Sequence, residues 1–202
     1  MDNRFLALGD SYTIGEGVPE RERWPVQLVA RLRAGGAKIG DPQIIARTGW
    51  TTDELAIAMD AARLEPPYAL VTLLVGVNNQ YRGRGLDEYR AQFHSLLMRA
   101  IELAGADPRR VIVVSIPDWG VTPFARDGRR DPAQTAAQID AFNAAARMDA
   151  DAHGALFVDI TGISRDPRHR HLLGADGLHP SGEQYARWVE AIGPVAAEIL
   201  ET

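Results

Sequence analysis

The segment Gly9-Asp10-Ser11-Tyr12 carries the first residue of the chain that could do chemistry. The apolar residues Phe5–Leu8 predict a short buried strand, and the glycines and small polar residues that follow predict a sharp turn. Ser11 then lies at the carboxyl end of a strand, where ligands bind to an open parallel sheet. Its hydroxyl is a candidate nucleophile, although Asp and Ser also cap backbone amides in ordinary turns.

A serine hydroxyl becomes a good nucleophile when a base removes its proton, and the base works best when a carboxylate fixes its tautomer. Two Asp-x-x-His segments offer such a pair, at residues 166–169 and 176–179. Asp176 begins an Asp-Gly turn, and His179 leads directly into a capped helix, so its imidazole is held by its neighbours. The other segment lies among arginines in the middle of a loop. We therefore take His179 as the base and Asp176 as the residue that orients it.

Acyl transfer also needs hydrogen-bond donors where negative charge develops, and losing one donor typically costs on the order of a hundred- to a thousand-fold in rate. Two segments that follow predicted strands could supply them. Gly49 would let its backbone N–H approach a ligand closely, and Asn78 could point its side-chain amide at the same place. Taken alone, each residue is better explained by an ordinary turn or loop.

Strand and helix patterns alternate along the chain, and they predict which elements hold these residues. The strands are expected at residues 5–8, 43–48, 68–75, 110–116 and 156–160, and the helices at about 24–34, 51–64, 86–104, 132–153 and 181–199. This alternation predicts an α/β protein with a parallel sheet and helices on both faces. Residues 68–75 are the most continuously apolar and predict the central strand. Pro194 should kink the last helix.

Two connections that follow strands are long, at residues 117–130 and 161–180. Structureless connections of that length in a compact domain are usually functional or disordered. Both should emerge at the same edge of the sheet as Ser11, so they predict a site at this edge.

The composition is that of a globular protein and excludes several classes of function. With 202 residues, 46% hydrophobic and 24% charged, the chain suits one domain, residues 1–202, with a sizeable core. A net charge of -5 without a long basic run argues against nucleic acid as the main partner. The absence of cysteine excludes disulfides, a thiol nucleophile and a cysteine metal site.

The start of the chain and the length of its apolar runs predict where the protein is located. The first strand begins within five residues of Met1, which leaves no room for a signal peptide. The longest apolar run, residues 69–75, is too short to span a bilayer. We therefore expect a cytoplasmic protein without a membrane span.

The other histidines are not expected to bind a metal. His94 and His153 lie on predicted helices and are interpreted as surface residues. His169 and His171 form a His-x-His pair, but no third ligand lies nearby in the sequence, so a solvated loop explains them better. The sequence therefore predicts neither a metal nor a cofactor.

The candidate residues occur in an order that resembles a known family, the SGNH hydrolases or GDSL-type esterases and lipases. The matching segments are Gly9-Asp10-Ser11-Tyr12 with Gly15-Glu16-Gly17 for the first block, Gly49 for the second, Gly76-x-Asn78 for the third and Asp176-x-x-His179 for the fifth. The resemblance covers about residues 5–190. Two departures are Asn79, where the family usually has Asp, and Tyr12, in place of the Leu of the motif name.

The resemblance implies a flavodoxin-like three-layer α/β/α fold with a five-stranded parallel sheet in the order 2-1-3-4-5. It also implies that Ser11 is the nucleophile, His179 the base and Asp176 the third member of the triad. The Ser11 N–H, the Gly49 N–H and the Asn78 side chain would form the oxyanion hole. Members of the family hydrolyse carboxylic esters, from small acyl esters to lysophospholipids and acetylated sugars, without a metal.

Several further side chains on the expected active edge could contact a substrate. They are Asp10, Tyr12, Trp50, Asn79, Tyr81, Trp119, Phe124 and Leu178. Aromatic loop anchors that pack on the core are an equally good explanation of the aromatic ones.

These predictions converge on a serine esterase that acts on a small-molecule ester, with short acyl groups expected because no strongly hydrophobic lid is evident. Two alternatives remain open. A lysophospholipase, thioesterase or acyltransferase could use the same residues, because an acyl-enzyme can pass its acyl group to water or to another acceptor. A binding module on the same fold could hold an ester or a sugar without turnover.

Overall fold

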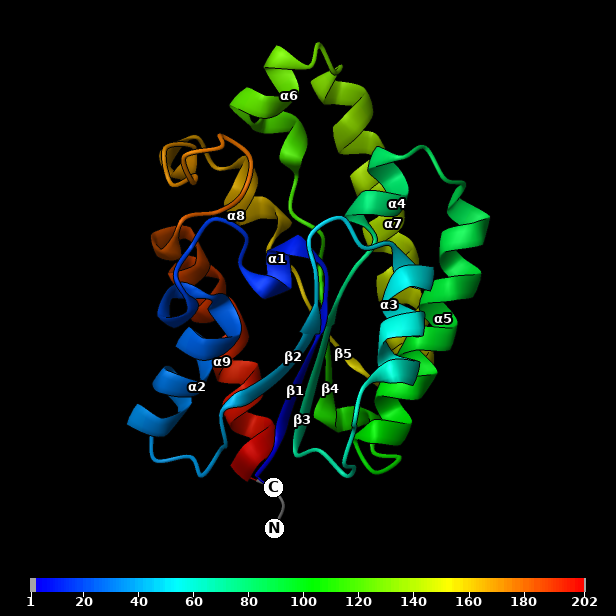
Figure 1. Cartoon of the computed structure of the whole chain (residues 1–202), viewed down its shortest axis with the longest axis vertical. Coiled ribbons are helices and arrows are strands. Elements are labelled where there is room, and N and C mark those ends of the chain that lie inside the picture. The colour runs from blue at the N-terminus through cyan, green and yellow to red at the C-terminus, as the bar shows by residue number, and fades with distance from the viewer. Residues whose placement is uncertain (1–2, 202) are drawn as a thin grey trace.

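The computed structural model describes residues 3–201 and has a five-stranded parallel sheet at its centre (Figure 1). The strands are β1 (Phe5–Gly9), β2 (Pro42–Ala46), β3 (Leu70–Leu74), β4 (Val111–Val114) and β5 (Leu156–Val158). Their order is β2-β1-β3-β4-β5, and every neighbouring pair is parallel. The order confirms the predicted topology, with β3 in the middle as its apolar sequence indicated.

Helices cover both faces of the sheet (Figure 1). On one face lie α2 (Trp24–Ala34) and α9 (Gly182–Glu201), and on the other α3 (Thr52–Ala61), α5 (Leu86–Leu103) and α7 (Pro132–His153). Four short helices follow the carboxyl ends of strands: α1 (Ser11–Ile14), α4 (Val77–Tyr81), α6 (Pro123–Asp127) and α8 (Thr161–Arg165). This confirms the three-layer fold. None of the helices within residues 3–201 combines the length and hydrophobicity that a membrane span requires.

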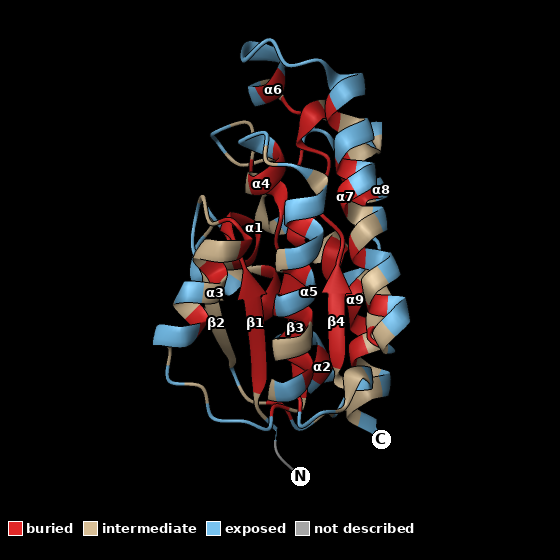
Figure 2. Ribbon diagram, turned by 90° about the vertical axis from the view of Figure 1, so that its right-hand side faces the viewer, coloured by how far each residue is buried: buried red, intermediate tan, exposed pale blue. Residues whose placement is uncertain are grey.

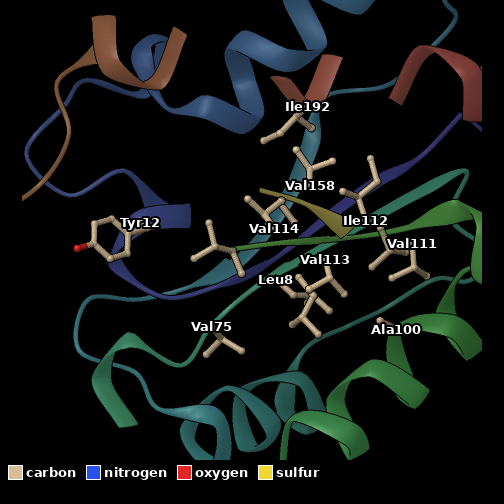
Figure 3. Close-up of a cluster of buried hydrophobic side chains, with 14 of the residues drawn as sticks. Leu8, Tyr12, Val75, Ala100, Val111, Ile112, Val113, Val114, Val158 and Ile192 are labelled. Atoms are coloured by element: carbon tan, nitrogen blue, oxygen red, sulfur yellow. The ribbon is translucent and has the colours of Figure 1, made fainter. Parts of the chain in front are cut away.

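The three inner strands, β1, β3 and β4, are buried along their whole length, and the edge strand β2 is partly exposed (Figure 2). The other edge strand, β5, is also partly exposed. Alternate residues of each inner strand point to opposite faces, so both sides need an apolar cover. Figure 3 shows the cluster of buried apolar side chains around these strands, with Ala100 of α5 on one side of the sheet and Ile192 of α9 on the other. Burying each Val, Leu or Ile side chain stabilises the folded state by about 1.5–3 kcal/mol. The resulting rigid sheet positions the loops at its edge.

The ends of the long helices follow their local sequence. Thr51 and Glu54 form the predicted capping box at the start of α3, where the Thr51 N–H donates to Glu54 Oε2 at 2.9 Å. Asp131 caps α7 by accepting from the Ala133 N–H, also at 2.9 Å, and Gly154 ends that helix with φ 76°. α9 continues through Pro194 to Glu201, so the proline does not end the helix.

The prediction that residues 117–130 and 161–180 lack secondary structure is wrong. The first contains a 3-10 turn at Trp119–Val121 and α6, and the second contains α8 and a 3-10 turn at Pro167–His169. The local signals were present at α6, since Pro123 stands at its first position and Thr122 Oγ1 accepts from the Ala125 N–H. The segment after β3, expected as a loop, likewise forms α4.

Candidate active site

A cavity of about 170 Å³ opens at the carboxyl ends of the strands, where the short helices gather at the top of Figure 1. Its lining comes from segments far apart in the sequence: Ser11, Tyr12, Thr48, Gly49, Val77, Asn78, Tyr81, Trp119, Phe124, Leu178 and His179. The sequence indicated Ser11, Gly49, Asn78 and His179 separately, and the structure places all four in the lining of this one cavity.

Ser11 is the first residue of α1, directly after the turn that ends β1. The turn is tight: a Cβ on Gly9 would lie 2.5 Å from the Leu74 carbonyl oxygen, so a larger residue would push β1 away from β3. Asp10 caps α1 by accepting from the Tyr12 N–H at 3.1 Å. The strand and the cap together hold the Ser11 side chain at the cavity.

Asp176 and His179 form the hydrogen bond that their spacing predicted. His179 Nδ1 lies 2.6 Å from Asp176 Oδ2, while Asp176 Oδ1 accepts the Leu178 N–H at 2.9 Å and the His179 N–H at 3.0 Å. Burial alone would raise the pKa of the Asp176 carboxyl, but these hydrogen bonds outweigh it and lower the pKa below its ordinary value. The carboxylate therefore stays ionised and holds the proton on Nδ1, which leaves Nε2 as the ring nitrogen that can accept one.

His179 itself is largely buried, and its ring packs edge-on against Tyr12 with 5.7 Å between ring centroids. Among the described residues no hydrogen bond joins Ser11 Oγ to the imidazole, although both side chains line the same cavity. Such bonds are often long in ligand-free enzymes and shorten in the substrate complex. The two groups thus share the space that a reacting carbonyl would enter.

Three residues that line this cavity, Ser11, Gly49 and Asn78, each have an N–H group without an acceptor among the described residues. Among the hydrogen bonds of residues 3–201, neither the Ser11 N–H nor the Gly49 N–H has an acceptor. Gly49 has a left-handed φ of 87°, and Arg82 holds the loop by donating to the Gly49 carbonyl oxygen at 2.6 Å. Asn78 Nδ2 donates one N–H to the Trp50 carbonyl oxygen at 2.9 Å, which leaves its second N–H available.

Three of the residues expected near a substrate lie outside the cavity lining: Asp10, Trp50 and Asn79. Trp50 contributes its carbonyl oxygen to Asn78, as above. Asn79 is completely buried and links α4 to the start of α3, because its Oδ1 accepts the Thr52 N–H at 3.1 Å and its Nδ2 donates to Thr52 Oγ1 at 2.7 Å. An amide supplies both an acceptor and a donor here, which a carboxylate does not.

Asp10 is also completely buried, beneath the turn that carries Ser11. Burial raises the pKa of its carboxyl to about 7, against the lowering effect of hydrogen bonds from the Tyr12 and Gly76 N–H groups. Its Oδ2 atom has no hydrogen-bond partner among the described residues. Asp10 can therefore act on the site only through the backbone that it holds.

Aromatic side chains form one wall of the cavity. Tyr81 packs against Trp119 at 5.3 Å and against Phe124 at 6.4 Å between ring centroids, and Arg130 lies over the Tyr81 ring at 5.2 Å. Trp119 is buried and donates from Nε1 to Gln80 Oε1 at 2.8 Å. The outer rings of Tyr81 and Phe124 are 42% and 39% exposed, so this wall extends from the cavity onto the surface.

Trp119 is held in place by an ionic network that the sequence did not reveal. Asp118, buried beside it, accepts from Arg165 Nε at 2.8 Å, and Arg165 also donates to Asp140 Oδ1 at 2.8 Å. The Asp118 N–H donates to Ser164 Oγ at 2.9 Å. Ser164 and Arg165 therefore connect α8 to the 3-10 turn that carries the aromatic wall.

Sequence reasoning also missed Val77 in the lining and Arg82 behind Gly49. Helical spacing would have found both: if residues 77–81 are read as a helix, Val77 and Tyr81 share one face, and Arg82 follows Asn78 by one turn. The helix was missed because Gly76 and two asparagines are typical of a loop.

A family model and several solved structures resemble this chain. The family model described as "GDSL-like Lipase/Acylhydrolase family" matches residues 7–187, whereas a comparison with curated protein sequences finds no significant match.

Solved structures with the same fold include a psychrotrophic esterase, EstA, from Pseudoalteromonas sp. (TM-score 0.75, 16% identity, covering 100% of each chain). A lipase/acylhydrolase from Enterococcus faecalis has a TM-score of 0.72 and 22% identity, with 99% of this chain and 97% of that one covered. Axe2, an acetyl xylan esterase from Geobacillus stearothermophilus, has a TM-score of 0.71 and 19% identity, with 96% and 94% covered. At these identities the likeness is one of fold.

Proposed function

The chain belongs to the GDSL-like lipase/acylhydrolase family, and we propose that it is a serine esterase that hydrolyses carboxylic esters with short acyl groups. One observation carries the proposal: a single cavity is lined by Ser11, Gly49 and His179, and the N–H groups of Ser11 and Gly49 have no acceptor among the described residues. The match over residues 7–187 also supports our proposal that residues 1–202 are one hydrolase domain.

The proposed reaction begins when Ser11 Oγ attacks the ester carbonyl carbon while His179 Nε2 takes the hydroxyl proton. The carbonyl oxygen becomes negatively charged and accepts hydrogen bonds from the Ser11 N–H, the Gly49 N–H and Asn78 Nδ2. The carbon–oxygen bond to the alcohol then breaks, and the proton on His179 passes to the departing alcohol oxygen. A water molecule, deprotonated by His179, attacks the acyl-enzyme and releases the acid together with free Ser11.

Asp176 makes this proton transfer possible by holding the His179 ring. Its carboxylate keeps the proton of the neutral imidazole on Nδ1 and stabilises the positive charge when Nε2 is protonated. The lowered pKa of Asp176 supports this role, because the carboxylate remains ionised throughout the pH range in which a neutral imidazole is available.

The size of the cavity supports short acyl groups. At about 170 Å³ it is smaller than the roughly 300–1,000 Å³ of sites that enclose drug-sized ligands. Val77, Trp119 and Leu178 provide apolar surface for an acyl group, and the alcohol part of the ester would extend along the exposed rings of Tyr81 and Phe124. Two of the structural relatives are themselves described as esterases, one of them acting on acetyl xylan.

The test is a series of p-nitrophenyl esters from acetate to palmitate, with wild-type protein and Ser11→Ala. We expect turnover to be highest at short chains, and Ser11→Ala to lower kcat by on the order of 10⁴-fold or more without changing the melting temperature. Ser95→Ala, a change of an exposed serine on α5, is the matched control and should keep full activity. Full hydrolysis by Ser11→Ala would overturn the serine mechanism.

The same series separates the alternatives that use these residues. A maximum at long chains would favour a lysophospholipase or a thioesterase. Product analysis with a competing alcohol would detect an acyltransferase, because the acyl group would then appear on the added alcohol instead of in the free acid. A folded wild-type protein that hydrolyses none of the esters would favour the non-catalytic binding module.

A further inference from the structure

A second cluster of chemically active side chains lies away from the cavity, on the outer side of the helical layer formed by α5 and α7. His94 of α5 meets Asp149 and His153 of α7 there, and one ligand atom from each of the three lies within 4.8 Å of the others. The two helices run side by side in Figure 1. The sequence predicted both histidines as surface residues, and it gave no sign that they meet.

Helix geometry explains why the three residues converge. Asp149 and His153 are four residues apart on α7, so they lie one above the other on the same face. α5 packs against that helix through Tyr89, whose ring stacks on Phe142 with 4.5 Å between centroids. His94 is therefore brought to Asp149 by the packing of α5 against α7, which makes the cluster a preorganised one.

The two distances to Asp149 Oδ1 are close to those that a tetrahedral metal ion requires. His94 Nδ1 lies 3.0 Å and His153 Nδ1 lies 3.3 Å from Asp149 Oδ1. Ligand atoms held about 2.0–2.2 Å from a tetrahedral zinc ion are roughly 3.3–3.5 Å apart. A ligand atom of each imidazole lies within 4.8 Å of the other, and His153 Nδ1 also lies 2.9 Å from the Asp149 carbonyl oxygen. To bind zinc, the His153 ring would therefore turn away from that carbonyl and the two imidazoles would close around the ion.

The hydrogen bonding of Asp149 leaves capacity for an additional partner. Its Oδ2 atom is buried and makes no hydrogen bond to any residue that the structure describes, which is costly for a carboxylate oxygen. Direct or water-mediated contact with a cation would compensate it. A cavity of about 440 Å³, lined by His94 and Asp149, adjoins the cluster and gives an ion and its water a route in.

We propose that His94, Asp149 and His153 form a binding site for a divalent transition metal, with Zn²⁺ the best fit, that links α5 to α7. Two imidazoles and one carboxylate favour zinc over the harder Mg²⁺ and Ca²⁺, which prefer shells made only of oxygen. Water from the cavity would complete the four ligands. Arg90 lines the same cavity and opposes a cation electrostatically, so Arg90→Gln should tighten binding.

The test is isothermal titration of EDTA-treated, dialysed protein with ZnCl₂, with MgCl₂ as the control ion. We expect one zinc ion per chain at this site, and His94→Ala or His153→Ala should weaken it by about tenfold or more. Zinc at about a hundredfold excess over the wild-type Kd should raise the melting temperature of the wild type by about 5–10 °C, and at the same zinc concentration that rise should fall to about half or less in both variants.

Two further variants separate this site from the other histidines. His171→Ala removes the exposed histidine of the His-x-His pair, and His179→Ala removes the imidazole at the active-site cavity. Both variants should bind zinc at the α5–α7 site as the wild type does. The proposal is wrong if the wild type binds no zinc, if it binds Mg²⁺ equally well, or if zinc binding survives His94→Ala and His153→Ala unchanged.

Discussion

Asp166–His169 and Asp176–His179 repeat one spacing within a single connection, and both aspartates begin by making the same turn. Asp166 Oδ1 accepts the Arg168 N–H at 2.9 Å, and Asp176 Oδ1 accepts the Leu178 N–H at 2.9 Å. Beyond this shared turn the two segments differ completely. Asp176 binds the imidazole of His179 at 2.6 Å, whereas His169 Nδ1 stays 3.9 Å from the nearer carboxylate oxygen of Asp166.

The residue directly before each histidine, Arg168 or Leu178, accounts for the difference. The guanidinium of Arg168 donates to both oxygens of Asp166, at 2.7 Å from NH2 and 3.1 Å from Nε, and holds the pKa of that carboxyl at about 2. His169 instead contacts the Ile163 carbonyl oxygen at 3.3 Å. Leu178 has no charge with which to compete, so Asp176 Oδ2 remains available to His179. An Asp-x-x-His spacing therefore makes a dyad only when the third residue leaves the carboxylate free.

The largest expected effect compares the two histidines. His179→Ala removes the proposed base and should lower kcat for ester hydrolysis by on the order of 10⁴- to 10⁶-fold. His169→Ala removes only a contact to a carbonyl oxygen and should leave kcat within about twofold of the wild type. Steady-state kinetics on the preferred p-nitrophenyl ester measure both. Comparable losses in the two variants would mean that the segments are not functionally distinct.

The aspartates should differ in the same direction by a smaller factor. Asp176→Asn would let the imidazole adopt the wrong tautomer and should cost on the order of 10²- to 10⁴-fold in kcat. The loss in kcat would be about 10²-fold if water, which reaches the half-exposed side chain of residue 176, stabilises part of the positive charge on the imidazole. Asp166→Asn should leave kcat unchanged. Circular dichroism and melting temperatures check that both variants fold, and an active Asp176→Asn would argue against the triad.

A change of the backbone in residues 176–179 should affect activity less than the loss of the Asp176 or His179 side chain. Gly177 has φ 64°, and a Cβ there would lie 3.3 Å from the Pro123 Cβ. Gly177→Ala should therefore cost about 1–2 kcal/mol in the free energy of unfolding, and we expect kcat to fall several-fold as His179 shifts. Urea unfolding and kinetics measure both quantities.

Gly162 provides the matched control, because a Cβ added there meets no atom within 4 Å and the residue lies in α8. Gly162→Ala should leave stability unchanged or raise it by up to about 1 kcal/mol, since alanine favours a helix. Equal destabilisation by the two changes would show that the left-handed turn at Gly177 carries no special strain.

The smallest effect concerns a single carboxyl. Arg168→Leu gives residues 166–169 the same third residue as residues 176–179, and the pKa of Asp166 should rise from about 2 toward about 3.9. A carboxyl whose pKa is lowered by folding stabilises the protein above its unfolded pKa, and this stabilisation is lost as the pH falls through the folded pKa. The variant should therefore be less stable than the wild type near neutral pH, and its stability should fall less than that of the wild type between pH 4 and 2.

Side-chain carboxyl chemical shifts followed against pH measure this change directly. Ester hydrolysis should be unaffected, because Ser11 lines a cavity that includes His179 and not His169. A pKa that stays near 2 in Arg168→Leu would mean that the backbone turn, and not the guanidinium, holds the Asp166 carboxylate.

Much of the fold could be predicted because it depends on local patterns. The apolar run before Ser11, the capping box at Thr51 and the Asp131-Pro132 start of α7 each act within a few residues, and each appears where it was expected. The short helices α4, α6 and α8 were missed, because elements of five residues are too short for periodicity to reveal them.

By itself, the sequence determined the residue types of the candidate site and the strand after which each one comes. Parallel strands all end at one edge, so their order along the chain was enough to bring Ser11, Gly49, Asn78 and His179 to the same region. Only the tertiary structure decided that Asn79 supports α3 instead of lining the cavity, that Arg165 holds Asp118, and that His94 meets Asp149. Those contacts depend on how separate helices pack, and packing is set by side chains across the whole core rather than by any local pattern.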